Sequence, residues 1–323
     1  MKHHQTMSTL ALVCLFALIV LGCEAKDPSK NSPTSGNLIL YVDEAYENLI
    51  RPLADSFTTN HAPDMNIEIR TVQARDAVEE LINLHIAHLA DTSTVDTAAA
   101  VAIIIGRSLL EDEKKVIADR HLEKGLMDIP LAWDGLAIVV PNDSPLQETT
   151  VERLKESLTK ENRTLSSLQE TKGSNAPRFI FPSANSSSYA YVRNRLLNGG
   201  EPATPARWVE TTDSVLDQIA NGEGIGLMAW YPAHLDSLRL RTLRVGYTDS
   251  TGAVQPPTRI HPASLVMNKY PMKLRIVGYS FSGIKSPANG FLSWLARSDV
   301  AQHEMGKIGL EPENVHFVFT TEE

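Results

Sequence analysis

A serine-rich segment, Ser183 to Ser188, separates an apolar run from a helix-like stretch of sequence. The start of a helix exposes backbone N–H groups that have no helical partner, together with the positive end of the helix dipole. Hydroxyl and amide side chains at the same place add neutral donors, so Asn185, Ser186, Ser187 and Ser188 form a candidate oxyanion site. The alternative is that one serine caps the helix and the others form a loop, because Ser and Asn are common capping residues.

Arg107 follows the apolar run 98–105 and Gly106, which places it at the carboxyl end of a predicted strand. Ligands of open α/β sheets bind beyond this edge, and a guanidinium there can grip an oxyanion through two N–H groups. Arg107 is therefore a candidate anion-binding residue. The alternative is a surface arginine that pairs with Glu111 or Glu113.

Two carboxylates, Asp43 and Glu44, follow the first predicted strand and lie at the equivalent edge of the sheet. A carboxylate accepts a hydrogen bond from a protonated oxyanion and repels an oxyanion that lacks the proton. In a shared site, these residues would therefore favour hydrogen phosphate over sulfate. The alternative for Asp43 is an ordinary helix cap.

Signatures of enzymes and metal sites are incomplete in this chain. The segment 278–282 begins like a nucleophile elbow, but Ser282 stands where the second glycine is required. The segment 222–227 lacks the last glycine of the dinucleotide-binding fingerprint. His85 and His88 have a spacing that could hold a metal, but no carboxylate or cysteine triad accompanies them. We therefore predict no catalysis, no cofactor and no metal site.

Apolar runs alternate with amphipathic stretches along the chain, which predicts strands alternating with helices. The predicted strands are 38–42, 67–69, 98–105, 136–140, 179–181 and 225–230, and the predicted helices lie near 49–57, 76–88, 150–158, 188–197, 213–220, 289–296 and 299–307. Thr149 and Thr212 are the expected caps of the third and fifth helices. Short, uniformly apolar strands between helices are typical of parallel sheets covered on both faces, so the predicted fold class is α/β.

The 323 residues carry a formal net charge of −9. An acidic chain is a poor match for nucleic acid and for a polybasic membrane contact. The negative net charge does not exclude a small anionic ligand, because such a ligand is held by nearby hydrogen-bond donors and not by the charge of the whole chain. The length favours two lobes over a single core.

Cys23 stands between an apolar run, residues 10–21, and a polar tract rich in Lys, Ser, Pro and Asn. A charged start followed by a short apolar run describes a secretory signal and not a membrane-spanning helix. With cysteine at the first mature position, the pattern resembles a bacterial lipoprotein signal. We expect removal of residues 1–22, lipidation of Cys23 outside the cytoplasm, and a flexible tether over 23–36. The alternative is an ordinary signal peptide in which this cysteine is incidental.

Several short motifs occur in a characteristic order between residues 37 and 312. They are 102–113, with a strand that ends in Arg107; 134–142, with the sequence DGLAIVVPN; 185–188, at the position of a Ser-Gly-Thr anion loop; 224–226; and the C-terminal segments 270–271, 290–295 and 309–312. In this order, they resemble the substrate-binding lipoproteins of bacterial phosphate ABC importers, the PstS-like family. In the first loop, where members of that family place Gly, Ser and Thr, this chain has Asp43, Glu44 and Ala45.

The resemblance implies a type II periplasmic-binding-protein fold, in which crossing strands join two α/β lobes around a ligand cleft. Lobe I is expected to combine residues 37–133 and 261–323, and lobe II to span 134–260. The resemblance also implies a monomeric, membrane-anchored protein that delivers phosphate to an ABC importer permease. The implied ligand-binding residues are Asp43, Glu44, Ala45, Arg107, Asn185, Ser186, Ser187 and Ser188.

Two other functions stay open from the sequence. One is a binding protein for another oxyanion, such as sulfate or molybdate. The other is an extracytoplasmic sensor or assembly protein that kept the fold without transporting a ligand.

Overall fold

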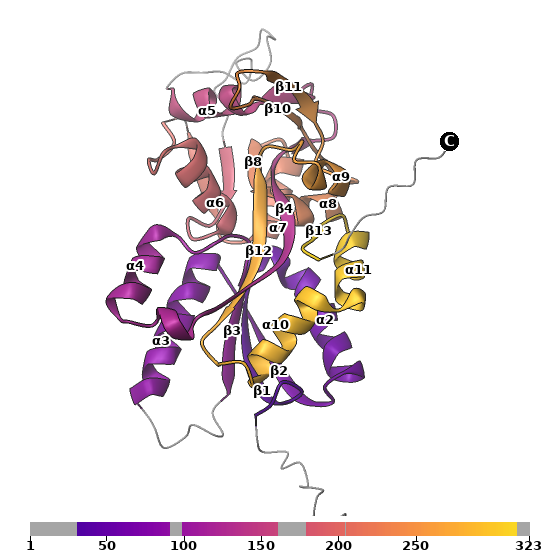
Figure 1. The fold of residues 1–323 in the computed structure, drawn as a ribbon. Helices are drawn as coiled ribbons and strands as arrows, with labels where there is room; N and C mark the ends of the chain where they lie inside the picture. Colours follow the sequence, from indigo (N-terminus) through magenta and orange to yellow (C-terminus); the bar gives the residue numbers. More distant parts are fainter. Residues whose placement is uncertain (1–30, 91–98, 161–178, 204, 315–323) are drawn as a thin grey trace, which may run out of the picture.

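The computed structural model describes residues 31–90, 99–160, 179–203 and 205–314. The expected signal peptide and Cys23 lie outside the described residues, as does most of the expected tether. Figure 1 shows two stacked α/β halves with long strands running between them. Within the described ranges, no helix combines the length and the apolar character needed to cross a bilayer.

The lower half in Figure 1, lobe I, is built on strands in the order β2, β1, β3, β12, β4. β1 (Ser35–Asp43) pairs in parallel with β2 (Asp64–Val72) and with β3 (Ala100–Ile105). β12 (Lys273–Ser280) runs antiparallel to β3 and to β4 (Met127–Pro141). The predicted α/β class and its parallel strands are confirmed, whereas β12 is a strand that we did not predict.

Both faces of the lobe I sheet are covered by helices. Successive side chains of a strand point to opposite faces. Leu40 and its neighbours two residues away pack with α2 (Glu47–Asn60) and α10 (Pro287–Arg297). Tyr41 points to the other face and packs with α3 (Ala74–Ala90). This two-sided burial explains why β1, from Leu38 to Val42, and β3 are apolar without alternation.

The upper half, lobe II, continues the sheet in the order β4, β8, β6, β7. β6 (Phe179–Pro182) pairs in parallel with β8 (Ile225–Ala229) and β7 (Ala206–Val209). The serine-rich segment that follows β6 leads into α6 (Ser187–Tyr191). This helix continues as a π-helical segment over Val192–Leu196. The carboxyl ends of these strands therefore place the start of α6 at the edge that faces lobe I.

A small separate sheet caps lobe II. It joins β5 (Glu148–Thr150), β10 (Arg244–Thr248) and β11 (Val254–Thr258). The remaining elements are α4 (Glu111–Asp119), α5 (Val151–Thr159), α7 (Thr212–Ala220), α8 (Trp230–Leu235), β9 (Leu240–Thr242), α9 (Pro262–Val266), α11 (Asp299–Lys307) and β13 (Glu311–Pro312), with short 3-10 turns at Glu44–Tyr46 and Glu123–Gly125.

Two predicted helix caps are wrong by one residue. Thr150, not Thr149, caps α5 by accepting the Arg153 N–H. Thr211, not Thr212, caps α7 by accepting the Ser214 N–H. The second shift matters, because it leaves the Thr212 hydroxyl free to bind outside the helix.

One strand, β4, belongs to both lobes. It pairs with β12 over residues 127–135 and with β8 over residues 136–139. The predicted strand 136–140 is only the lobe II part of this longer element. Backbone hydrogen bonds therefore connect the two sheets through a single continuous strand.

Asp134 lies on β4 just before this change of partner and is fully buried. Its carboxylate accepts hydrogen bonds from the Gly135 N–H (2.7 Å), the Tyr46 hydroxyl (3.2 Å) and the Tyr231 N–H (3.3 Å). Tyr46 follows β1 in lobe I, and Tyr231 lies on α8 in lobe II. Burial raises the pKa of Asp134 to about 7, although these hydrogen bonds favour its ionised form.

Asp134→Asn should flatten the pH dependence of stability. The folded-state pKa of Asp134, about 7, lies above the unfolded value of about 3.9, so the native state holds this proton more tightly. The resulting stabilisation is present at low pH and is lost as the pH rises through about 7. In urea titrations from about pH 5 to about pH 8, the wild type should lose about 1 kcal/mol or more of unfolding free energy relative to D134N.

Asp55→Asn is the matched control, because it removes an exposed carboxylate on α2. It should keep the wild-type slope. If the curves of the wild type and D134N run parallel, Asp134 does not titrate in this range.

Candidate functional site

The carboxylate of Asp43 joins the two lobes at the carboxyl edge of β1. Its Oδ2 accepts hydrogen bonds from the Ser187 hydroxyl (2.5 Å) and the Gly106 N–H (3.3 Å). Its Oδ1 accepts the Ala45 N–H (3.4 Å), so Asp43 also caps the turn Glu44–Tyr46. Asp43 is 1% exposed, which makes this a buried contact between a lobe I strand end and a lobe II helix start.

Glu44 makes a second contact across the cleft. Its Oε1 accepts the Thr212 N–H (2.8 Å), and its Oε2 lies 3.3 Å from the Thr212 hydroxyl, which donates to it. Gln73 donates its side-chain amide to the same oxygen of Glu44 (3.0 Å). Thr212 begins α7 in lobe II, so both carboxylates of the first loop bind donors at lobe II helix starts.

Ser186 and Ser188 belong to the start of helix α6, and neither hydroxyl binds Asp43. Ser186 is the N-cap of α6, since its Oγ accepts the Tyr189 N–H (3.1 Å). Ser188 is buried in the first turn of the same helix. The alternative in which one serine caps the helix therefore describes Ser186, whereas Ser187 turns its hydroxyl to Asp43.

Asn185 contacts the start of α3 in lobe I. Its side-chain amide donates to Asp76 (2.7 Å), and its backbone C=O accepts the Arg75 N–H (3.0 Å). The segment 185–187 thus meets lobe I through two neighbouring contacts, one at α3 and one at the end of β1.

Arg107 is engaged by Glu113. Its two terminal nitrogens donate to the two carboxylate oxygens of Glu113 at 2.7 and 2.6 Å. Arg107 and Glu113 are 6% and 5% exposed, so the predicted alternative partner is correct but the pair is buried, not at the surface. The Nε of Arg107 is buried and has no hydrogen-bond partner among the described residues.

All of the predicted site residues except Glu44 line one or both of two cavities, which share Ser186. The inner one, about 10 Å³, is lined by Asp43, Ala45, Ser187, Ser188 and Thr212, among others. The outer one, about 890 Å³, is lined by Arg107, Asn185 and several other basic and aromatic side chains. The structure therefore brings Asp43 and the serines together, whereas Arg107 reaches only the outer cavity.

The two first-loop carboxylates are easier to protonate than ordinary ones. Burial raises the pKa of Asp43, against the opposing hydrogen bonds from Ser187, Gly106 and Ala45. Burial likewise raises the pKa of Glu44, against its hydrogen bonds from Thr212 and Gln73. Both carboxyl groups therefore take up a proton at a higher pH than an exposed carboxyl group does.

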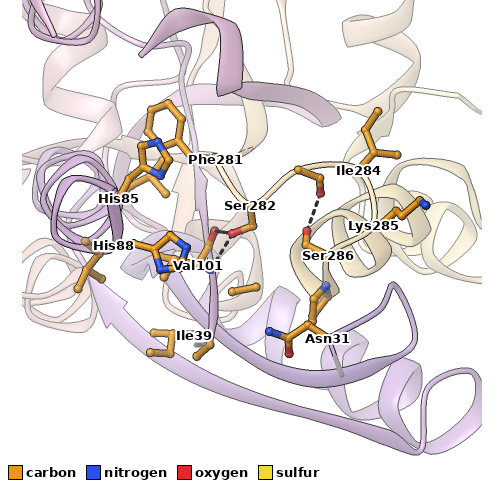
Figure 2. Close-up of a pocket in the computed structure, with 16 residues that line it drawn as sticks. Asn31, Ile39, His85, His88, Val101, Phe281, Ser282, Ile284, Lys285 and Ser286 are labelled. Atoms are coloured by element: carbon orange, nitrogen blue, oxygen red, sulfur yellow. Dashed lines mark hydrogen bonds between the residues drawn. The ribbon is translucent and has the colours of Figure 1, made fainter. Parts of the chain in front are cut away.

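A different cavity of about 1040 Å³ lies beside α3 and the start of β3, and Figure 2 shows its lining. His85 and His88 line it, and the His85 ring stacks on Phe281 with 4.3 Å between centroids. Within the described ranges, no group of three or more His, Cys, Asp or Glu could hold a metal. Ser282, of the incomplete nucleophile elbow, donates to the Val101 C=O (3.3 Å). None of the predicted ligand-binding residues lies here.

The sequence predictions missed three residues that donate hydrogen bonds to Asp43 or Glu44. They are Gly106, which donates its N–H; Thr212, assigned to the wrong role; and Gln73. Gly106 has no side chain that could mark it as a binding residue. Its place at the carboxyl end of β3, directly before Arg107, could have identified it as a backbone donor. An added Cβ at Gly106 would lie 2.5 Å from the Tyr46 ring, so glycine is required for this close approach.

The arrangement described above is the two-lobed α/β fold of type II periplasmic binding proteins. The chain belongs to the PBP superfamily, whose domain model matches residues 27–299. The fold resemblance seen in the sequence motifs is therefore confirmed. A search of curated proteins found no match to this chain.

Solved structures share the fold at low sequence identity. A protein from Clostridium perfringens, named as a phosphate ABC transporter substrate-binding protein with bound phosphate, is 14% identical, with 86% of this chain and 99% of that chain covered and a TM-score of 0.65. An ABC-type phosphate transport receptor from Vibrio cholerae is 15% identical, with 86% and 100% covered and a TM-score of 0.59. The regulatory domain of a LysR family regulator from N. meningitidis is 13% identical, with 86% and 98% covered and a TM-score of 0.50.

Glu113→Ala should destabilise the protein by about 3–5 kcal/mol, because it leaves the buried Arg107 guanidinium without its carboxylate partner. Glu111→Ala is the matched control. It breaks the exposed pair with Lys114 and should cost no more than about 1 kcal/mol. Urea denaturation measures both free energies, and equal losses would contradict a structural role for the buried pair.

Proposed function

We propose that this protein is an extracytoplasmic solute-binding protein that captures hydrogen phosphate between its lobes. One observation supports the ligand class most directly: the donors that meet in the cleft bind carboxylate oxygens. Ser187 and Gly106 donate to Asp43, and Thr212 donates to Glu44. Donors arranged around carboxylate oxygens also suit phosphate oxygens, since both are anionic acceptors.

Phosphate binding would exchange one anionic acceptor for another. A phosphate that takes the donors of Ser187 and Gly106 comes to lie beside the Asp43 carboxylate. Two adjacent anions repel each other unless a proton lies between them. Hydrogen phosphate supplies that proton, and the raised pKa of Asp43 suits the role of acceptor. Sulfate carries no proton at neutral pH and would be repelled.

The lobes would open and close about the crossing strand. We propose that residues 37–133 with 261–323 form one lobe and residues 134–260 the other, with the hinge near Asp134. Arg195, which lines the outer cavity and forms no ion pair with a described residue, would attract the anion. Closure would bury the anion and present a closed surface to an ABC importer permease. The phosphate proteins from C. perfringens and V. cholerae share this fold, which supports the same class.

A second candidate is an extracytoplasmic sensor or assembly protein that transports nothing. The bonds of Asp43 to Ser187 and of Glu44 to Thr212 favour it, because they hold the lobes together through the chain's own carboxylates. Binding measurements separate the candidates. If the wild type binds neither phosphate nor another oxyanion in the cleft, the sensor or assembly function is preferred.

Asp43→Asn should reduce the discrimination between phosphate and sulfate. Asparagine removes the negative charge that repels sulfate, and its side-chain amide can donate a hydrogen bond to an oxyanion that carries no proton. In calorimetry with phosphate as the ligand and sulfate as the competitor, sulfate should compete at least about tenfold better in D43N than in the wild type.

Asp64→Asn, at an exposed carboxylate where β2 begins, should behave as the wild type. If sulfate already competes as well as phosphate in the wild type, Asp43 does not act as the proton acceptor.

We further propose that the protein is a lipoprotein anchored through Cys23 to a membrane outside the cytoplasm. In a bacterial host fed with labelled palmitate, Cys23→Ser should lose the label and leave the membrane fraction. Cys14→Ser removes the other cysteine of the chain and should keep the label. Labelling of C23S would show that the lipid is attached elsewhere.

A further inference from the structure

A cavity of about 210 Å³ on lobe II, beside α8, is lined by basic side chains. Arg241 comes from β9, Arg244 from β10, and Arg259 from the segment after β11. His234 of α8 adds an imidazole, which stacks on Trp230 with 4.4 Å between ring centroids. Three arginines from separate segments therefore line one small cavity.

Arg241 is held in place by neutral acceptors. Its terminal nitrogens donate to the Leu146 C=O (2.6 Å), the Ser144 C=O and the Gln147 side chain. Its Nε is buried and has no hydrogen-bond partner in the part of the chain that the structure describes. A guanidinium stays protonated at physiological pH. This position thus keeps a full positive charge that no described carboxylate neutralises.

The charge balance distinguishes this cavity from the cleft. In the cleft, Arg75, Lys273 and Arg275 each pair with a carboxylate. No acidic residue is among the described residues that line the lobe II cavity. Of its three arginines, only Arg244 forms an ion pair with a described residue, the half-exposed Glu148 (2.8 Å). Like charges gathered without counter-charges repel, so the arrangement favours binding of an anion.

We propose that this cavity is a second anion site, separate from the cleft, for a compact divalent oxyanion. Its volume lies below the roughly 300–1,000 Å³ of pockets for drug-sized ligands, which favours an anion of the size of sulfate or phosphate. Arg259 and Arg244 supply charged donors, and Arg241 supplies a positive charge that its hydrogen bonds hold in place.

Sulfate is the probe for this site, because Asp43 is expected to repel it from the cleft. The wild type, titrated calorimetrically with sodium sulfate at constant ionic strength, should show one binding event. Arg259→Ala truncates an exposed side chain and should weaken this event at least about tenfold, since a charge-assisted hydrogen bond is lost. Arg297→Ala, at an exposed arginine that ends α10, is the matched control and should bind sulfate as the wild type does.

The outcomes separate this site from the cleft. The phosphate event that Asp43→Asn alters should persist in Arg259→Ala, so a failure of phosphate binding in the cleft leaves the sulfate test valid. No sulfate binding by the wild type in the millimolar range would overturn the second site. Equal sulfate affinity in Arg259→Ala and the wild type would also overturn it, as would equal losses in Arg259→Ala and Arg297→Ala.

Discussion

The hydrogen bond between Asp43 and Ser187 is the contact on which the candidate site depends. It exists because β1 and β3 are parallel, so Asp43 and Gly106 reach the same edge of the lobe I sheet. The start of α6 meets that edge only because β4 continues from one sheet into the other and holds lobe II in place. A carboxylate, a backbone N–H and a hydroxyl from three segments then share one buried position.

The protein carries a net negative charge, yet basic side chains line both the outer cavity of the cleft and the lobe II cavity. A net charge of −9 sets the long-range field, but burial and local donors decide what each site binds. In the cleft, Asp43 and Glu44 take the donors themselves, and Glu113 neutralises Arg107. Under the proposed function, an incoming anion would have to match the proton chemistry of two carboxyl groups as well as the geometry of the donors.

The fold was largely predictable where strands are buried on both faces. The runs at 38–42 and 98–105 are continuously apolar, so their pattern identifies parallel strands. β12 carries a different signal, because Lys273 and Arg275 alternate with apolar residues in the pattern of a half-buried strand, which our prediction missed. The edge strand β11 contains two consecutive prolines, which argue against a strand when only the sequence is read.

The sequence by itself determined which chemical groups stand at the ends of the strands: the acids after β1, the guanidinium after β3 and the serines after β6. Only the tertiary structure decided their partners. Arg107 binds Glu113 with its terminal nitrogens, Glu44 binds Thr212, and Ser187 alone of the serines binds Asp43. The reason is physical: residue type and spacing specify what a group can bind, whereas distance and burial, set by the packing of the whole chain, select the partner.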